Sequence, residues 1–380
     1  KVGFSNETKP RYVIPTLVGR QMLRENAKVD CEMRMRMYGD EVIPCRALLD
    51  LTHPVKSGII FQKDDLLDLW RYVLEKKMGV KNPADLRVLV TEAPFTPIDN
   101  KRKILEILLN DLGVGMCNIE AQAKLSIFSE GIETGMVIDS GDGVSHCIPI
   151  VSGKILSHFS DRINLAGSDI THRLIQLLQF KGYAFNSSSD YELIRELKER
   201  YCFVSCDYQS DKLLDKETCF YNSYYLLPDG SRIHISNEKF EAPEILFRPS
   251  LIGREEDGIH EMVFKSVMKC PIDTRRPLFG SMVLSGANTL FPGFASRIEN
   301  EVKSLYKKNV ANENTKGHTG MAFNIIDSYK RKYSVFIGGT ILANYYNKAE
   351  GDDYWISAEE FNNSDPEELI KKKCQSYLKE

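Results

Sequence analysis

The sequence of 380 residues lacks any run of about 18 apolar residues, the length that a helix needs to cross a bilayer. It also lacks charge of one sign, because 50 basic residues face 53 acidic ones and leave a net charge of -3. No global field therefore draws the chain to nucleic acid or to an anionic membrane. The first residues, KVGFSN, contain no apolar signal segment. We expect a soluble, cytoplasmic protein with no membrane insertion and no bound nucleic acid.

Cysteine patterns that indicate metal binding or disulfide frameworks are absent too. The nine cysteines show no metal-ligand spacing, the closest pair being Cys202 and Cys206, and their odd number argues against a complete disulfide framework. We find no zinc motif, no nucleophile elbow and no Cys–His pair of the kind used in nucleophilic catalysis. The sequence predicts reduced, mostly buried thiols.

Strand-like and helix-like patterns alternate over most of the length, which favours an α/β architecture with sheets covered by helices. The hydrophobic content of 42% is enough for a sizeable core in two or three domains. The predicted buried strands are 87–91, 135–139, 281–286 and 333–339. The predicted helices include 100–110 and 191–200, the second with cap candidates at 188–190.

The segment 137–146, VIDSGDGVSH, carries the clearest chemical pattern. A strand delivers Asp139 to its end, and the Ser-Gly-Asp-Gly turn that follows can adopt positive φ and point backbone N–H groups at a phosphate. Asp139 and Asp142 add carboxylate oxygens of the kind that bind Mg²⁺ together with phosphates and waters. Asp-Gly is also a common hairpin turn, so a plain hairpin is the alternative.

Other candidates admit two interpretations each. The glycine turn 285–289 follows a buried strand and could let the backbone approach a flat ligand such as a base. The turn 337–340 is explained equally well by close strand-to-helix packing. Lys198 and Glu199 share the charged face of a predicted helix and fit a solvated surface as well as a ligand contact. Gln122 and His146 fit satisfied core polar groups as well as catalytic ones.

Taken in order, the segments 139–146, 165–171, 285–293 and 332–339 resemble the actin family, and the resemblance runs from Lys1 to about Phe361. It implies the two-lobed ATPase fold shared by actin, Hsp70 and sugar kinases. Each lobe would hold a mixed sheet flanked by helices, with ATP or ADP and Mg²⁺ or Ca²⁺ in the cleft between lobes. Four subdomains are implied: 1–15, 54–129 and 334–380 for the first, 16–53 for the second, 130–165 and 255–333 for the third, and 166–254 for the fourth.

The resemblance also implies roles for particular residues. Gln122 and His146 match the catalytic pair that orders the attacking water, and Asp139 lies near the water shell of the metal. Hydrolysis of ATP would be slow at most and would serve as a conformational timer. The residues implied to contact the nucleotide are Lys1, Asp139, Ser140, Gly141, Asp142, Gly143, Val144, Gly167, Lys198, Glu199, Gly286, Leu290 and Lys332.

The sequence departs from the family pattern at several places. The first phosphate loop of the family, Asp-x-Gly-x-Gly, would precede Lys1, and we expect an incomplete sequence rather than the loss of half the phosphate clamp. Ala287 and Asn288 stand where the family usually has a glycine and a small hydroxyl residue, which narrows the base pocket. Ser57 stands where conventional actin has a histidine. The loop 306–320 is longer than the family norm.

Within the family, segments such as 182–186, 240–244 and 332–343 are most similar to a subunit of the complex that nucleates branched actin filaments. This implies as partners actin-related protein 3, the other subunits of that complex, actin and nucleation-promoting factors. The segment 246–253 is instead similar to the self-polymerising filament subunits of the family, such as centractin. A metabolic kinase of the same fold is a third hypothesis.

Overall fold

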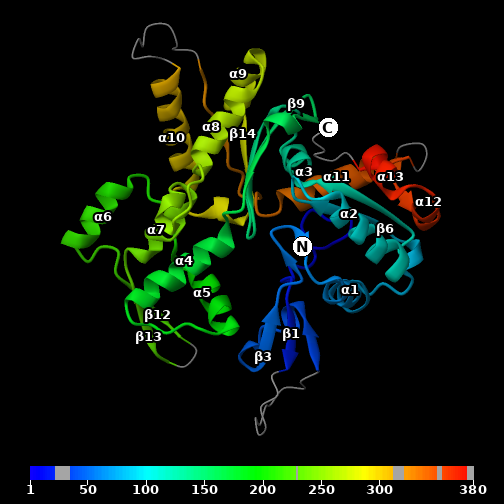
Figure 1. Ribbon diagram of the computed structural model, residues 1–380, viewed down its shortest axis with the longest axis horizontal. Coiled ribbons are helices and arrows are strands. Elements are labelled where there is room, and N and C mark those ends of the chain that lie inside the picture. Colours follow the sequence, from blue (N-terminus) through cyan, green and yellow to red (C-terminus); the bar gives the residue numbers. More distant parts are fainter. Residues whose placement is uncertain (22–34, 228–229, 311–320, 349–352, 375–380) are drawn as a thin grey trace. The chain divides into compact units, whose positions relative to one another are not determined.

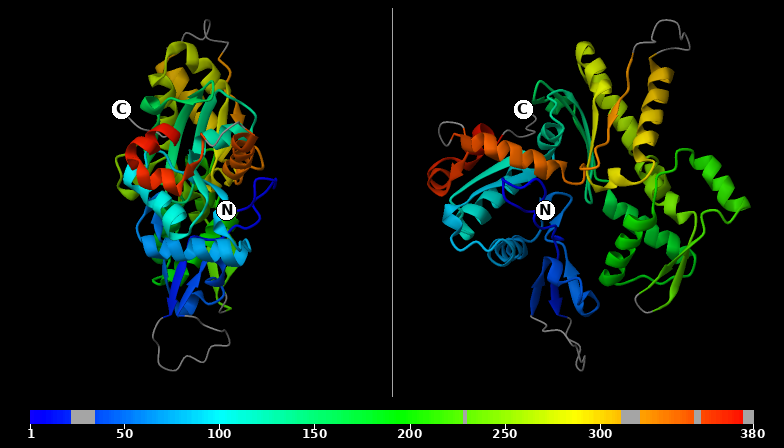
Figure 2. Two further views of the ribbon diagram at one scale, coloured as in Figure 1. Left: turned by 90° about the vertical axis from the view of Figure 1, so that its right-hand side faces the viewer. Right: turned by 180° about the vertical axis from the view of Figure 1, so that it is seen from behind.

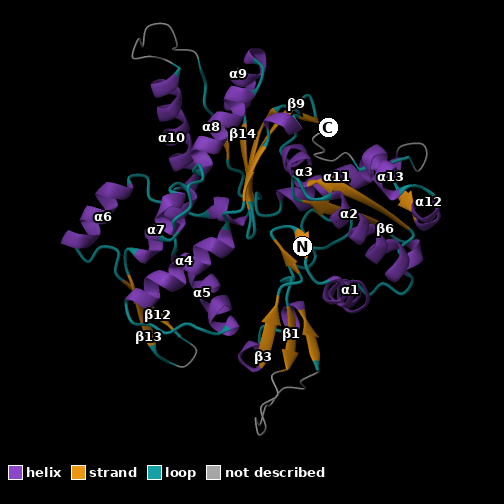
Figure 3. Ribbon diagram, viewed as in Figure 1, coloured by secondary structure: helices purple, strands orange, loops and turns teal. Residues whose placement is uncertain are grey.

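The computed structural model describes residues 1–21, 35–227, 230–310, 321–348 and 353–374. The chain divides into two compact units, which are described separately: unit 1 is Lys1–Gly131 with Tyr333–Glu380, and unit 2 is Ile132–Lys332. Each unit combines sheets with helices, as predicted (Figure 1, Figure 3). The finer division into four subdomains stays a prediction, and residues 311–320 of the long loop lie outside the described part. None of the described helices is long and apolar enough to cross a membrane.

Unit 1 contains two three-stranded sheets. One has the order β16-β7-β6, with β6 and β7 parallel and β16 antiparallel to β7, and the other is the antiparallel sheet β2-β1-β3. The strands of unit 1 are β1 (Val18–Gln21), β2 (Arg36–Tyr38), β3 (Leu49–Thr52), β4 (Val55–Lys56), β5 (Ile59–Ile60), β6 (Arg87–Glu92), β7 (Met116–Ala121) and β16 (Ile356–Ser357). Its helices are α1 (Lys63–Tyr72), α2 (Ile98–Leu105), α3 (Gln122–Ser129), α11 (Ser334–Lys348), α12 (Ala358–Asn363) and α13 (Pro366–Lys373).

The predicted strand 87–91 and helix 100–110 are confirmed in unit 1. The strand is β6, whose β-branched and apolar residues suit a pleated surface. The helix is α2, which continues as a π-helical segment, Glu106–Asp111. Asn100 anchors α2, because its Oδ1 accepts a hydrogen bond of 2.8 Å from the backbone N–H of Ile60 in β5. This bond joins α2 to β5, and residues of β5, α2 and β6 pack in one core.

The prediction of a strand at 333–339 is wrong, because these residues begin helix α11. The run is apolar and β-branched, which is typical of a buried strand, but here a helix is packed against another helix, α3. Gly338 makes this contact possible, since a Cβ on it would collide with the carbonyl oxygen of Leu125 in α3. Gly338 therefore reflects close helix-to-helix packing, and the glycine pair forms no strand-ending turn.

Unit 2 is built around one six-stranded sheet with the order β10-β9-β8-β14-β15, in which β11 also pairs with β9. Strand β8 pairs antiparallel with β9 and parallel with β14, which pairs in parallel with β15. The strands of unit 2 are β8 (Gly135–Ser140), β9 (Ser145–Val151), β10 (Lys154–Ile155), β11 (Asp161–Ile163), β12 (Ser223–Leu226), β13 (Arg232–Ile235), β14 (Met282–Ser285) and β15 (Ile325–Ile326). Its helices are α4 (Gly167–Phe180), α5 (Ser188–Tyr201), α6 (Tyr208–Glu217), α7 (Glu238–Glu241), α8 (Ile259–Lys269), α9 (Ile272–Gly280) and α10 (Phe294–Asn309).

The predicted strands 135–139 and 281–286 are confirmed as β8 and β14, both buried along their whole length. Helix α8 packs against β8 and β9 and also against α10, while α4 packs against α5 (Figure 2). The predicted helix 191–200 is confirmed as α5. Its N-cap is Ser187, one residue before the expected candidates, and Asp190 closes a capping box with it. The sheet that carries the turns after β8 and β14 is thus covered by helix α8.

The cysteine prediction is confirmed for the described part of the chain. The eight described cysteines form no disulfide with one another, and only Cys206 and Cys219 are exposed. Cys374 is fully buried with Ile370 in the core of unit 1. The amphipathic helix α13 turns its apolar side inward and carries Cys374 with it.

Candidate functional site

The carboxyl ends of two parallel strands meet at one edge of the unit 2 sheet. In the register of β8 and β14, Asp139 lies opposite Ser285, so the turns that follow the two strands open at the same edge. Asp139 is 6% exposed at this edge. Ligands of open α/β sheets bind outside the carboxyl ends of the strands. This edge is therefore a candidate binding site.

The turn after β8 is a hairpin that leads to β9, so the hairpin interpretation is correct for its local geometry. The N–H of Gly141 donates to the carbonyl of Val144 at 3.1 Å. The amino end of α4 docks on this turn, since the N–H of Gly167 donates to the carbonyl of Gly141 at 3.1 Å and that of Ser168 to the carbonyl of Asp142 at 2.8 Å. The positive end of the α4 dipole thus faces the turn, a feature that an isolated hairpin lacks.

Helix α5 places a buried cation beside this turn. The Nζ of Lys198 donates to the carbonyl oxygen of Gly167 at 2.6 Å. Burial lowers the pKa of Lys198, although the charges of Asp142 and Glu199 act in the opposite direction. The interpretation of Lys198 as solvated surface is therefore wrong. Glu199 fits that interpretation, because it is exposed and pairs with Arg195 at 3.0 Å.

The turn after β14 is tied to the turn after β8. Gly286 has φ of +87°, and a Cβ on it would collide with the carbonyl oxygen of Ser140. We expected positive φ in the turn after β8. The residue that has it is Gly286 in the turn after β14, and Gly141 does not. The side-chain Nδ2 of Asn288 donates to the Oγ of Ser140 at 3.0 Å and to the carbonyl of Gly141 at 2.5 Å. Three of the four segments that suggested the family therefore meet at this edge.

Asp139 and His146 lie opposite each other in the β8–β9 register, which puts their side chains on one face of the sheet. His146 is fully buried, and within the described part of the chain neither of its ring nitrogens has a hydrogen-bond partner. Burial lowers the pKa of His146, against the opposing charge of Asp139. The imidazole is therefore neutral at pH 7. Buried polar atoms without partners are costly, so this pair of side chains is suited to a ligand or an ordered water.

Comparison with known proteins shows the family to which the chain belongs. The family model described as Actin matches residues 1–375. The chain belongs to the actin family. It is 38% identical over 372 residues to actin-related protein 2 of Acanthamoeba castellanii, covering 98% of this chain and 95% of that protein. It is 37% identical over 373 residues to actin-related protein 2 of Saccharomyces cerevisiae, with the same coverage. Against actin-related protein 2 of Drosophila melanogaster it is 38% identical over 368 residues, covering 95% and 92%.

Membership in the actin family implies a bound nucleotide with a divalent cation. The unit 2 edge fits both groups. Asp139 makes no ion pair or side-chain hydrogen bond with another described residue, and His146 beside it has unpartnered nitrogens. No group of three or more ligating side chains occurs in the described residues. A cation would therefore be held by one or two carboxylates with phosphate oxygens and waters, which is the usual arrangement for Mg²⁺.

Of the remaining site residues predicted from the actin family, two belong to unit 1 and two to unit 2. Lys1 and Gln122 belong to unit 1, where Lys1 is exposed with its Nζ 5.5 Å from the ring centre of Tyr333, and Gln122 is the first residue of α3. Leu290 ends the turn after Gly286 and is partly exposed, as is Lys332, the last residue of unit 2. The roles of all predicted site residues stay predictions.

The sequence does not reveal the contacts that two polar residues, Ser145 and Asn288, make at this edge. The Oγ of Ser145 lies 2.8 Å from the Oγ of Ser140 and donates to the carbonyl of Leu165 at 2.7 Å, so it links the hairpin to the segment before α4. Asn288 was noted only as a departure from the family pattern. Both contacts depend on the strand register, which a single sequence does not reveal. The one signal in the sequence is the long amide side chain of Asn288, at a position where the family usually has a small hydroxyl residue.

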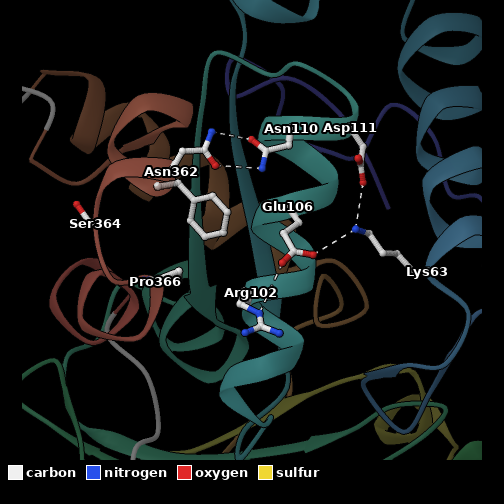
Figure 4. A pocket seen from close by; sticks show the side chains of 9 residues that line it. Lys63, Arg102, Glu106, Asn110, Asp111, Asn362, Ser364 and Pro366 are labelled. Carbon is white, nitrogen blue, oxygen red and sulfur yellow. Dashed lines mark hydrogen bonds and ion pairs between the residues drawn. The ribbon is translucent and has the colours of Figure 1, made fainter.

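A separate pocket of about 460 Å³ lies on unit 1, between the π-helical segment after α2 and the helices α12 and α13 (Figure 4). Its charged groups are paired with one another. Lys63 bridges Glu106 at 3.2 Å and Asp111 at 3.3 Å, and the amides of Asn110 and Asn362 bond reciprocally at 3.2 Å. Polar groups that are already satisfied offer little to a ligand. This pocket is therefore a weaker candidate than the sheet edge of unit 2.

Proposed function

We propose that this chain is an ATP-binding, actin-related subunit of the complex that nucleates branched actin filaments. The observation that carries the proposal is the similarity to actin-related protein 2 from several organisms, at 37% to 38% identity over 95% to 98% of the chain. Its partners would be actin-related protein 3, the other subunits of the complex, actin and nucleation-promoting factors. Its role is structural and regulatory, and its location is the cytoskeleton of the cytoplasm.

The nucleotide, as ATP or ADP with Mg²⁺ or Ca²⁺, would bind at the unit 2 edge. The turn 140–144 would hold phosphates, and Asp139 would hold the water shell of the cation. The cation neutralises phosphate charge when it is bound. Gly167, Lys198 and Glu199 would face the ribose and adenine, and the residues predicted to complete the site in unit 2 are Gly286, Leu290 and Lys332. Lys1 of unit 1 stays a predicted nucleotide contact.

Hydrolysis would be slow, with His146 acting on the attacking water. Its lowered pKa leaves a neutral ring that can accept a hydrogen bond from a water but is a weak base. Such a group orients the attacking water and takes its proton poorly. Gln122 stays the predicted second member of the pair. Slow turnover lets the bound nucleotide act as a timer, whose state biases the conformation that partners recognise.

Two experiments test the proposal. The complex is assembled with this chain and, separately, without it, and branch formation on actin filaments is counted by fluorescence microscopy. We expect branches only when the chain is present, and equal branching without it would contradict the proposal. In the second, the purified chain is centrifuged with ATP and Mg²⁺. We expect it in the supernatant, whereas pelleted filaments would favour a self-polymerising subunit.

A further inference from the structure

Asn288 occupies the centre of the candidate site but is assigned no role by the family pattern. It lies in the 3-10 turn Ala287–Leu290 that follows β14, and it is 4% exposed. Its Nδ2 bonds to two successive groups of the turn after β8, the Oγ of Ser140 at 3.0 Å and the carbonyl of Gly141 at 2.5 Å. Both hydrogens of the amide are thereby used within the protein.

The bonds of Asn288 complete a chain of contacts around the phosphate turn. The carbonyl of Gly141 also accepts from the N–H of Gly167, whose own carbonyl accepts from Lys198. The Oδ1 of Asn288 faces Gly167 so closely that a Cβ there would lie 2.9 Å from it. Asn288 therefore connects the turn after β14, the turn after β8 and the amino end of α4.

A small hydroxyl residue cannot replace these contacts. Serine or threonine has a single hydroxyl hydrogen and a shorter side chain, so it can donate to only one of the two acceptors. The asparagine of this chain thus supplies a cross-link that the usual residue would not. A loop held in its binding geometry before the ligand arrives loses less conformational freedom on binding.

We propose that Asn288 is a positioning residue for the phosphate turn 140–144, and that its amide holds this turn ready for nucleotide and slows nucleotide release. The proposal rests on nucleotide binding at the unit 2 edge. It makes this chain a member of the actin family that retains its nucleotide longer than it would with a small hydroxyl residue at position 288.

The test compares the whole chain with Asn288→Ser and with the matched control Asn309→Ser. Asn309 lies at the end of α10, is exposed and donates one hydrogen bond of 2.8 Å to the carbonyl of Leu305. Release of a fluorescent ATP analogue is followed after mixing with excess ATP and Mg²⁺. Because one of two buried hydrogen bonds is lost and the turn loosens, we expect Asn288→Ser to release nucleotide about tenfold faster, with the control unchanged.

A second measurement separates positioning of the turn from general stability. Hydrogen exchange of the peptide covering 139–145 is measured on the purified variants, with the peptide covering α8 as internal reference. We expect faster exchange in 139–145 only, both for Asn288→Ser and for Asn288→Asp, which keeps the size of the side chain but cannot donate to the carbonyl of Gly141.

The outcomes are distinct. Release and exchange equal to those of the unchanged chain would overturn the role of Asn288 while leaving the proposed function intact. Faster exchange in α8 as well as in the turn would show a general structural role and would also overturn it. If the unchanged chain binds no ATP analogue, the proposed nucleotide site fails, and the positioning role for nucleotide fails with it.

Discussion

Two sheet edges in this molecule have the same construction but different electrostatics. In unit 1, the parallel strands β6 and β7 end near Glu92 and Glu120, and in unit 2 the parallel strands β8 and β14 end near Asp139. Glu92 is paired with Lys101 at 2.8 Å, both side chains being 2% exposed, and Glu120 is paired with Lys124 at 3.3 Å. Asp139 has no such partner among the described residues.

The difference distinguishes carboxylates that are paired inside the protein from one that is left for a ligand. A carboxylate taken out of water needs a compensating charge, and in unit 1 that charge is a lysine of the same unit. In unit 2 the carboxylate lies at the edge beside a neutral His146 and pairs with no described cation, and we propose that a ligand supplies the compensating charge. We call the first edge closed, because internal ion pairs neutralise its carboxylates, and the second open, because its carboxylate has no ion-pair partner among the described residues.

The largest expected effect comes from opening the closed edge. Lys101→Met leaves the carboxylate of Glu92 buried without its cation, which we expect to cost about 3–5 kcal/mol in the free energy of unfolding. Burial already raises the pKa of Glu92 despite Lys101. The variant should therefore regain stability as pH falls and Glu92 takes up a proton. Denaturant unfolding at several pH values measures both effects.

Lys103→Met on the same helix, α2, is the matched control, because Lys103 is partly exposed and forms no ion pair among the described residues. It should change stability by less than about 0.5 kcal/mol. Equal losses for the two lysines would show that the buried ion pair does not close the edge of unit 1.

At the open edge we expect a change in nucleotide binding and almost none in stability. Asp139→Asn should leave stability almost unchanged, because Asp139 has no partner to lose in the protein alone. It should weaken binding of ATP with Mg²⁺ by roughly 10- to 100-fold, the effect of losing one interaction with a charged group. Calorimetric titration measures the affinity. A variant that binds normally but unfolds easily would reverse the comparison between the two edges.

The elements at these edges could be predicted from the sequence where the pattern is local. The strand before Asp139 and the glycine turn after it are visible in the segment 137–146, and so is the strand before Gly286. What joins the two turns is not local. The bonds from Asn288 to Ser140 and Gly141 link positions about 150 residues apart, and only the parallel register of β8 and β14 brings them together.

The misassigned segment 333–339 shows the opposite limit. A short apolar run has no periodicity that separates a strand from a buried helix. Its length decides the question, and α11 continues to Lys348. The two glycines were visible, but their partner was not, because Leu125 of α3 is more than 200 residues away in the chain. The contact between α11 and α3 therefore determines that this segment is a helix and that a glycine is needed at Gly338.

The packing of α11 against α3 gives the third prediction, which concerns a glycine of unit 1. Gly338→Ala should destabilise the protein by about 1–3 kcal/mol, because the new methyl group would collide with the backbone of Leu125 and push α11 from α3. Nucleotide affinity should not change in the folded variant. Thermal unfolding and calorimetric titration measure the two quantities.

Gly339→Ala in the same helix is the control. A Cβ on Gly339 would lie 3.6 Å from Cδ2 of Leu89 and 3.8 Å from Cδ1 of Leu125, which are ordinary contact distances. Because alanine favours a helix over glycine by about 1 kcal/mol, this variant should be as stable as the unchanged chain or slightly more stable. An equal loss of stability in Gly339→Ala would mean that α11 tolerates no side chain at either glycine.

The smallest effect concerns the neutral histidine of the open edge. Burial holds the pKa of His146 below its ordinary value of 6.5, so below that pH the unfolded chain binds a proton that the folded chain does not. Stability should fall as pH drops below about 6.5, by at most about 1.4 kcal/mol per pH unit from this one group. His146→Gln should flatten that part of the stability curve, whereas His158→Gln, a change at an exposed histidine, should not. If both variants keep the original slope, His146 is not the buried neutral group that leaves this edge open to a ligand.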